Sequence, residues 1–156
     1  MKNRYTCKTL TNPDDMLSTY ELALLLNPRI TTADYIETLN NACKTSNYRQ
    51  IVALKDDKPV SFVAIQDVVL MKCAPKKSMN ISNIATLPDE RGAVTQMLFA
   101  VIKQIAIDEG YGNMDVRSSK QNIAASKCYE KNGFQNEESY AWRMKIAGES
   151  NQRAKL

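Results

Sequence analysis

The chain has 156 residues, which fits one domain large enough to bury a core without disulfides or metals. Apolar residues make up 44% of it and charged residues 24%, and these ordinary globular proportions exclude the collagen, disordered and coiled-coil classes. Histidine is absent, which excludes His–Ser and His–Cys catalytic arrangements and histidine-containing metal sites, while the net charge of +4 favours an anionic ligand.

The N-terminal part of the chain predicts a strand followed by two helices. Residues 4–10 form the strand. A first helix over 12–27 begins at the capping residue Asn12, which a proline and two acids follow, and it ends before a second proline. Thr31 and Asp34 predict a capping box at the start of a second amphipathic helix.

The rest of the chain predicts a hairpin followed by a strand–helix–strand–helix–strand series. The predicted strands cover 50–54, 60–71, 79–87, 114–117 and 140–146, and the predicted helices run from Arg91 to Glu109 and over 122–132. Because a strand–helix–strand unit favours a parallel pair with a right-handed crossover, we predict an α/β fold with a mixed central sheet flanked by helices. One domain is expected over 1–146, with a polar tail over 147–156.

The cysteines and the N-terminus indicate the cell compartment. Cys7, Cys43, Cys73 and Cys128 lie too far apart for a CxxC motif, so a zinc ribbon or thioredoxin chemistry is not expected. The N-terminus has no apolar signal core, and no apolar run reaches transmembrane length. We therefore expect a cytoplasmic protein without a membrane partner. A nucleic-acid partner is not expected either, because the sequence has no basic stripe with interleaved aromatic residues.

The segment over 83–92 predicts an anion site between a strand and a helix. It reads as the end of a strand, a tight turn and a helix start, and a helix N-terminus leaves backbone N–H groups free to bind an anion. Gly92 permits close approach of a phosphate, and Arg91 adds a positive charge. The segment therefore favours a pyrophosphate site, although an ordinary turn is the alternative reading of this motif taken alone.

A second motif, NIAASKCYEKNGF over 122–134, is more specific. It resembles the last motif of the GNAT superfamily of acyl-CoA N-acyltransferases, which reads N-x-x-A-x-x-[LF]-Y-x-x-x-G-F. The residues that match are Asn122, Ala125, Tyr129, Gly133 and Phe134, with Cys128 in the apolar position. The upstream Arg-Gly pair and the elements between the two motifs also fall where that family places them, so the resemblance covers 48–146.

The resemblance implies a GNAT-like fold and an N-acetyltransferase that moves acetyl from acetyl-CoA to a primary amine by direct attack, with no metal. Tyr129 is then the general acid that protonates the departing CoA thiolate. The acceptor is a small-molecule or protein amine, and the oligomeric state, monomer or homodimer, stays open. The alternative is a catalytically silent GNAT-like module that binds acyl-CoA or a partner.

The resemblance also implies which residues hold CoA. They are Ile84, Ala85 and Thr86 for the pantetheine arm, Arg91, Gly92, Ala93, Val94, Thr95 and Gln96 for the pyrophosphate, and Asn122, which also caps its helix. The loop departs from the family pattern R-G-x-G-x-G/A, since the later glycines become Val94 and Gln96 or, with one residue deleted, Ala93 and Thr95. We prefer the deletion, and a Cβ at a position of positive φ there would cost about 1 kcal/mol or more.

A base for the attacking ammonium is less clearly marked in the sequence. An amine nucleophile must lose a proton, and no histidine is available to take it. The candidates are Asp67 at the end of the long strand, Glu21 on the first helix, and a water held by Ser82 or Asn83.

Overall fold

The computed structural model describes residues 4–117, 122–136 and 144–146. The chain forms two compact units, residues 1–121 and 122–156, and each is described by itself. Most of the predicted strand over 140–146, and the predicted tail over 147–156, lie outside the described residues. Within the described part, no helix has the length and apolar character needed to cross a membrane.

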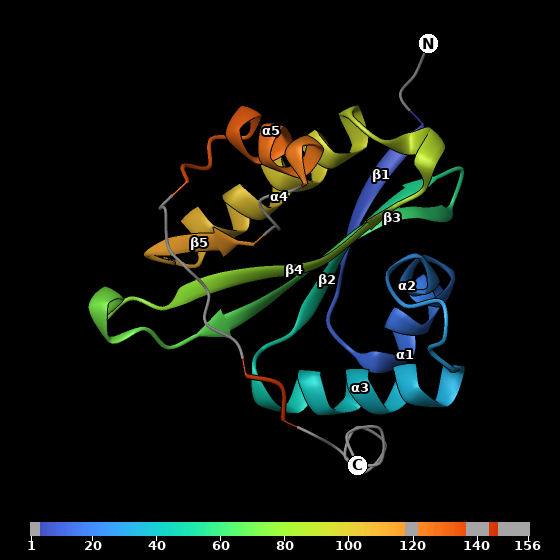
Figure 1. Cartoon of the computed structure of the whole chain (residues 1–156), viewed down its shortest axis with the longest axis horizontal. Coiled ribbons are helices and arrows are strands. Elements are labelled where there is room, and N and C mark those ends of the chain that lie inside the picture. The colour runs from blue at the N-terminus through green and yellow to red at the C-terminus, as the bar shows by residue number, and fades with distance from the viewer. Residues whose placement is uncertain (1–3, 118–121, 137–143, 147–156) are drawn as a thin grey trace. The chain divides into compact units, whose positions relative to one another are not determined.

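The first unit is built on a five-stranded sheet with the order β1-β2-β3-β4-β5 (Figure 1). Its strands are β1 (Tyr5–Leu10), β2 (Arg49–Lys55), β3 (Lys58–Val68), β4 (Ser78–Thr86) and β5 (Asn113–Val116). The first three pairings are antiparallel, and β4 pairs with β5 in parallel across the helix between them. The predicted mixed sheet, including its parallel pair, is confirmed.

Helices cover both faces of this sheet. One layer holds α1 (Pro13–Met16), α2 (Tyr20–Leu26) and α3 (Thr32–Thr45), and α4 (Ala93–Asp108) lies on the other face (Figure 1). Successive residues of β2 show this division, because side chains alternate along a strand. Gln50 bonds to residues of the first layer, whereas Arg49 bonds to Glu109 at the end of α4. The second unit contains α5 (Ile123–Lys131).

Local sequence signals set most helix ends. Asn12 Oδ1 accepts a hydrogen bond from the Asp15 N–H (2.9 Å), and Thr31 and Asp34 form the predicted capping box. Gly110, at φ +74°, follows the end of α4. These predicted caps and the helix stop are confirmed.

Two predicted elements differ from the structure. The helix over 12–27 is broken by a 3₁₀ turn, η1 (Leu17–Thr19), where the buried Thr19 hydroxyl donates to the Met16 carbonyl (2.7 Å) and competes with the helical ladder. The strand over 60–71 ends at Val68 because its partner strand begins there, opposite Ser78. The apolar pattern runs on beyond the ladder, and Val69 is 85% exposed.

Candidate functional site

The edge of β4 that faces β5 is open beyond Ile81. The parallel ladder pairs only Ser78–Ile81 with Asn113–Val116, while β4 itself continues to Thr86 and the two strands diverge (Figure 1). Within the described residues, the segment 82–86 therefore keeps one unpaired edge. An extended ligand that carries amide groups can bond to such an edge as an added strand would.

A β-bulge lies in the same segment. Ala64 pairs with Ser82 and Phe62 with Ala85, so two steps on β3 correspond to three on β4. Asn83 sits in the bulge with φ +51°, a left-handed conformation that asparagine tolerates better than most residues. A bulge turns peptide groups away from the regular ladder, and such turns are common beside active sites.

The side chains of the predicted pantetheine residues are engaged in the fold. Ala85 is 3% exposed and packs in an apolar cluster with Phe62, and the Thr86 hydroxyl bonds to that of Ser61 (2.7 Å). Ile84 is half-buried. These residues can therefore offer a ligand mainly their backbone groups, and their binding to CoA stays a prediction.

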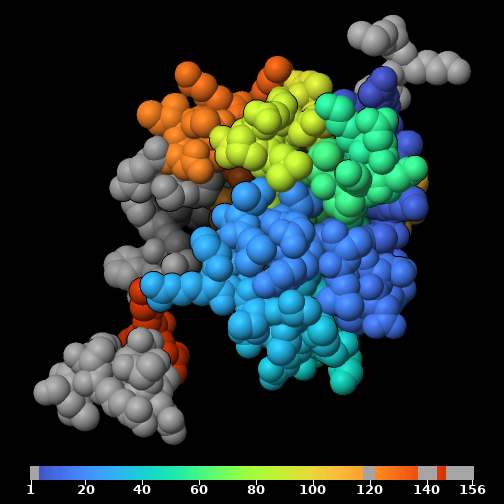
Figure 2. Space-filling view, turned by 90° about the vertical axis from the view of Figure 1, so that its right-hand side faces the viewer, coloured from blue at the N-terminus to red at the C-terminus, as the bar shows by residue number. Residues whose placement is uncertain are grey.

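The chain turns from β4 into α4 at the molecular surface. Leu87 N–H bonds to the Val60 carbonyl (3.0 Å), the 3₁₀ turn η3 (Pro88–Glu90) follows, and Gly92 precedes the helix (Figure 2, yellow-green). The ladder of α4 begins with the bond from Gln96 N–H to the Gly92 carbonyl (3.1 Å). The three amides ahead of it, those of Ala93, Val94 and Thr95, thus lie in the first turn, where helical carbonyls are lacking.

The start of α4 has no side-chain cap among the described residues. Asn12, Thr31 and Asn122 cap α1, α3 and α5, whereas α2 and α4 have no such cap. Gly92, at φ +100°, has no side chain to offer. This helix end is thereby left open to an anion.

The structure corrects the expected cost of the lost glycines. Among the loop residues Gly92 alone has positive φ, and α4 starts at Ala93. No further glycine is required, so Ala93 and Thr95 carry no backbone strain. The Val94 side chain is 2% exposed and belongs to the core, which leaves its N–H as the group it can present.

Glu90, two residues before Gly92, is held by two side chains of the sheet. Lys55 Nζ lies 2.8 Å from Glu90 Oε1, and the Tyr5 hydroxyl donates to the same carboxylate. The hydrogen bond from Lys55 lowers the pKa of Glu90, and the same bond raises the pKa of Lys55. A carboxylate near the open helix start is therefore neutralised, which favours an anion beside it.

The candidate base Asp67 lies at the other end of the sheet. It pairs with Met79 near the start of β4, whereas the open edge begins beyond Ile81. Its carboxylate accepts from the Tyr111 hydroxyl and lies 3.8 Å from Lys77 Nζ. Burial and, to a smaller extent, this bond to Asp67 raise the pKa of Tyr111 to about 12, so the phenol keeps its proton. Asp67 is thus engaged in a structural ion network away from the open edge.

In the second unit, α5 holds the C-terminal motif. Asn122 Oδ1 accepts from the Ala125 N–H (3.0 Å), which confirms the predicted cap. Gly133, at φ +92°, turns the chain so that the Phe134 N–H bonds to the Tyr129 carbonyl (3.0 Å) and the two rings meet edge to face, 6.1 Å apart. The spacing Y-x-x-x-G-F thereby fixes the Tyr129 ring. Burial raises the pKa of Tyr129, so its hydroxyl stays protonated near neutral pH.

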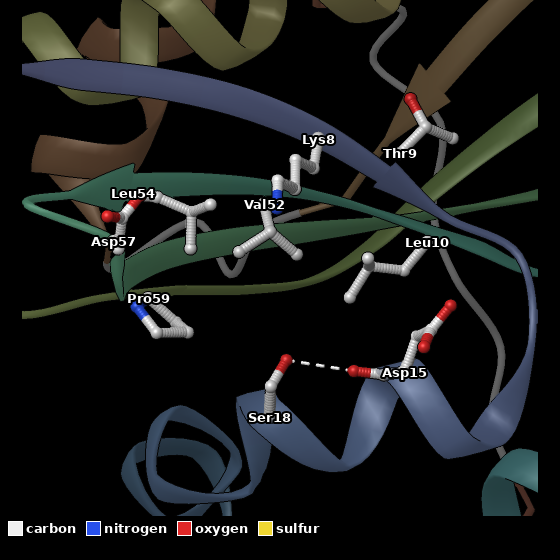
Figure 3. A pocket seen from close by; sticks show the side chains of 9 residues that line it. All are labelled: Lys8, Thr9, Leu10, Asp15, Ser18, Val52, Leu54, Asp57 and Pro59. Carbon is white, nitrogen blue, oxygen red and sulfur yellow. Dashed lines mark hydrogen bonds between the residues drawn. The ribbon is translucent and has the colours of Figure 1, made fainter.

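A cavity of about 570 Å³ opens between β1, the start of the helical layer and the β2–β3 hairpin (Figure 3). Its lining mixes charged, polar and apolar side chains: Lys8, Thr9, Leu10, Asp15, Ser18, Val52, Leu54, Asp57 and Pro59. None of the residues predicted to hold CoA lines it, so this cavity is separate from the open edge of β4.

Two features of the site were not predicted from the sequence. The sequence does contain a signal for the bulge. An asparagine is disfavoured within an apolar strand and tolerates positive φ better than most residues. The contacts of Glu90 have no signal in the sequence, because Tyr5 and Lys55 are remote in sequence. They contact Glu90 only because the order of the strands brings them beside it.

Comparison with known proteins identifies similar chains. The family described as "Acetyltransferase (GNAT) family" matches residues 16–134. No curated protein matches significantly by sequence. Among solved structures, the aminoglycoside N-acetyltransferase AAC(6')-Iy in complex with CoA is 16% identical, with a TM-score of 0.79, over 94% of this chain and 98% of that one.

Two further structures show the same fold. An aminoglycoside acetyltransferase, meta-AAC0020, from an uncultured soil metagenomic sample is 17% identical, with a TM-score of 0.79, over 94% of this chain and 99% of its own. A ribosomal-protein-alanine N-acetyltransferase from Brucella melitensis biovar Abortus 2308 is 18% identical, with a TM-score of 0.72, over 90% of this chain and 99% of its own.

Proposed function

Because this chain belongs to the acetyltransferase (GNAT) family and is an acetyl-CoA-dependent N-acetyltransferase, we propose that it acetylates a small-molecule primary amine. One observation carries the assignment to this site: the open edge of β4 is followed, after the short turn η3, by the uncapped start of α4. The first can bond an amide-bearing arm and the second a pyrophosphate, and acetyl-CoA presents both groups in one molecule.

The proposed chemistry assigns each group one task. The amides of Ala93, Val94 and Thr95, with Arg91, hold the pyrophosphate, and the backbone of Ile84 to Thr86 holds the pantetheine arm. The amine nitrogen attacks the thioester carbonyl, so a C–N bond forms while the C–S bond breaks. Tyr129 gives its proton to the CoA thiolate, and the proton that the ammonium must lose goes to water.

The acceptor class rests on the similar structures. Two of them are described as aminoglycoside acetyltransferases and a third as a ribosomal-protein-alanine N-acetyltransferase. The aminoglycoside acetyltransferases among these structures support a small amine as the acceptor class. We also propose a cytoplasmic setting, which the four free cysteine thiols support, since thiols persist in a reducing compartment.

Acetyl-CoA is expected to stabilise the protein against heat. A ligand that binds only the folded state at about 100 times its Kd adds about 2.7 kcal/mol, which raises the Tm by several degrees. Thermal melts with and without millimolar acetyl-CoA, backed by calorimetry, measure this. An unchanged Tm together with no binding heat would contradict the proposal, and binding without turnover on a broad amine panel would favour the silent module.

Removing Lys55 is expected to weaken acetyl-CoA selectively. In Lys55→Met the Glu90 carboxylate keeps its charge near the phosphate site without its cation, so the KM for acetyl-CoA should rise about 3- to 10-fold and less at high salt. Lys55→Met/Glu90→Gln removes both charges and should restore that KM. Steady-state kinetics with each substrate varied in turn measures both. An equal rise in the KM for the amine would point instead to a general disturbance.

A further inference from the structure

The ladder between β4 and β5 is short, and its start is the closed end of the site. It joins Ser78–Ile81 to Asn113–Val116, and within the part of the chain that the structure describes, the β4 segment over 82–86 has one unpaired edge. An unpaired strand edge is a template on which a neighbouring strand tends to pair. The edge therefore stays open to a ligand when β5 is held in its register from its first residue.

A polar cluster holds the residues that lead into β5. It consists of Arg49, Asp67, Lys77, Glu109 and Tyr111, which we call the Tyr111 network. The Tyr111 hydroxyl accepts a hydrogen bond from Arg49 Nη2 (2.9 Å) and donates one to Asp67 Oδ1. Arg49 Nη1 also bonds to Glu109 Oε2 (2.7 Å), at the end of α4. Tyr111 thus ties the entry of β5 to both β2 and β3.

Lys77 ties the same residues to the entry of β4. Its Nζ lies 3.8 Å from Asp67 Oδ2 and 4.4 Å from the centroid of the Tyr111 ring. Its carbonyl accepts from the Gly112 N–H (2.8 Å), one residue before the first ladder pair on each strand. Side-chain and backbone contacts therefore fix β4 and β5 to each other where both strands begin.

Burial makes the Tyr111 network sensitive to the loss of a single group. The Arg49 side chain is 11% exposed, and a charged group withdrawn from water is costly unless it is paired and hydrogen-bonded. The half-buried Tyr111 uses its hydroxyl both as donor and as acceptor within the network. Removing that hydroxyl therefore takes a partner from β2 and from β3 at once.

We propose that Tyr111 is a positioning residue for acetyl-CoA binding, which holds the start of β5 so that the edge of β4 over 82–86 stays free for the pantetheine arm. The ladder separates Tyr111 from that edge, so it acts through the register of β5 and not by contact with the ligand. Without the hydroxyl, β5 can shift along the unpaired edge, and the arm must compete with it. The inference rests on the proposed function, in which this segment carries the arm of acetyl-CoA.

Tyr111→Phe and Tyr35→Phe form a matched pair for the test. Each keeps the ring and deletes a hydroxyl that bonds to two side chains, which for Tyr35 are those of Thr19 (2.6 Å) and Gln50 (3.0 Å) in and beneath the helical layer. Their losses of Tm should be comparable. Tyr111→Phe is expected to raise the Kd for CoA about 3- to 10-fold, whereas Tyr35→Phe should stay within about 2-fold of the parent.

Two ligands separate the pantetheine arm from the phosphates. Calorimetry compares CoA with its phosphoadenosine diphosphate part, which carries the pyrophosphate and lacks the arm. Tyr111→Phe should weaken CoA and leave the affinity for the nucleotide at the parental value, because the start of α4 is unchanged. An equal loss for both ligands, or no loss for either, would overturn the inference.

A double-mutant cycle tests the route through Asp67. Asp67→Asn keeps the size of the side chain and removes the charge that Tyr111 and Lys77 share. It should show the same selective loss of CoA affinity, and Tyr111→Phe/Asp67→Asn should be no weaker than Asp67→Asn alone. Losses that multiply in the double variant would overturn the inference, since the two residues would then act independently.

Amide hydrogen exchange on the ligand-free protein gives a readout that needs no CoA. Tyr111→Phe should speed exchange in the β5 peptide over 113–116 about 3- to 10-fold, in line with the loss of one hydrogen bond, and Tyr35→Phe should not. Exchange there that is unchanged, or that rises equally in the two variants, would overturn the inference. If the parent binds no CoA, the proposed function fails, and the exchange comparison still decides whether Tyr111 holds the start of β5.

Discussion

Tyr129→Phe is expected to lower kcat by at least about 100-fold at neutral pH, the lower bound of general acid catalysis. The change keeps the ring, its edge-to-face contact with Phe134 and the turn at Gly133, and deletes the hydroxyl that we propose as proton donor. Acetyl-CoA affinity and Tm should therefore change little. Assays of CoA release measure kcat, and calorimetry on the same samples measures the acetyl-CoA affinity and the Tm.

The pH dependence separates a proton donor from a packing residue. Burial raises the pKa of Tyr129, so the parent keeps its donor at neutral pH and loses it only as the pH rises above the ordinary tyrosine range. The variant has no donor to lose, and its deficit should shrink in alkali. Tyr20→Phe, which deletes a hydroxyl bonded to the Ile30 carbonyl, is the control and should keep its kcat. If Tyr129→Phe turns over as fast as the parent, the proton for the thiolate comes from water and Tyr129 is a packing residue.

Gly92→Val is expected to raise the KM for acetyl-CoA about 10- to 100-fold, with a smaller effect on the KM for the amine. At φ +100° any residue with a Cβ is strained, and a branched residue most of all, so the loop would move the first amides of α4. No atom lies within 4 Å of the added Cβ, which makes backbone strain the expected cause rather than a clash. Initial-rate kinetics with each substrate varied in turn gives both constants.

Gly110→Val is the matched control for this substitution. Gly110 lies at the opposite end of α4, at φ +74°, and its added Cβ also meets nothing within 4 Å. Both variants should lose stability by similar amounts, of order 1 to 3 kcal/mol. A KM for acetyl-CoA that rises equally in both would show that strain in α4, and not the position of the first amides, weakens binding.

Local chemistry explains why the order of elements could be predicted. Asn12 and Thr31 cap helices through neighbours three residues away, and Gly110 ends α4 by its own backbone conformation. Each of these effects acts within one turn of chain, so the sequence contains it directly. The same holds for the C-terminal motif, whose cap and ring contact both lie between 122 and 134.

Long-range pairing explains what could not be predicted. The bulge at Asn83 depends on the register between β3 and β4, which brings together residues that are remote in sequence. Gln50 stands within an apolar strand, which hints at a buried polar partner, but the sequence does not say which hydroxyls meet it. The hydrogen bonds of Gln50 to buried hydroxyls are therefore apparent only in the folded arrangement.

Arg49 and Gln50 distinguish the correct register of β2 from one shifted by a residue. Arg49 reaches Glu109 (2.7 Å) on one side of β2, and Gln50 reaches the buried hydroxyls on the other. A slip of β2 by one residue would exchange their sides and place a guanidinium among the buried hydroxyls without its carboxylate. An unpaired buried charge costs about 3 to 5 kcal/mol, so these two adjacent residues favour one alignment during folding.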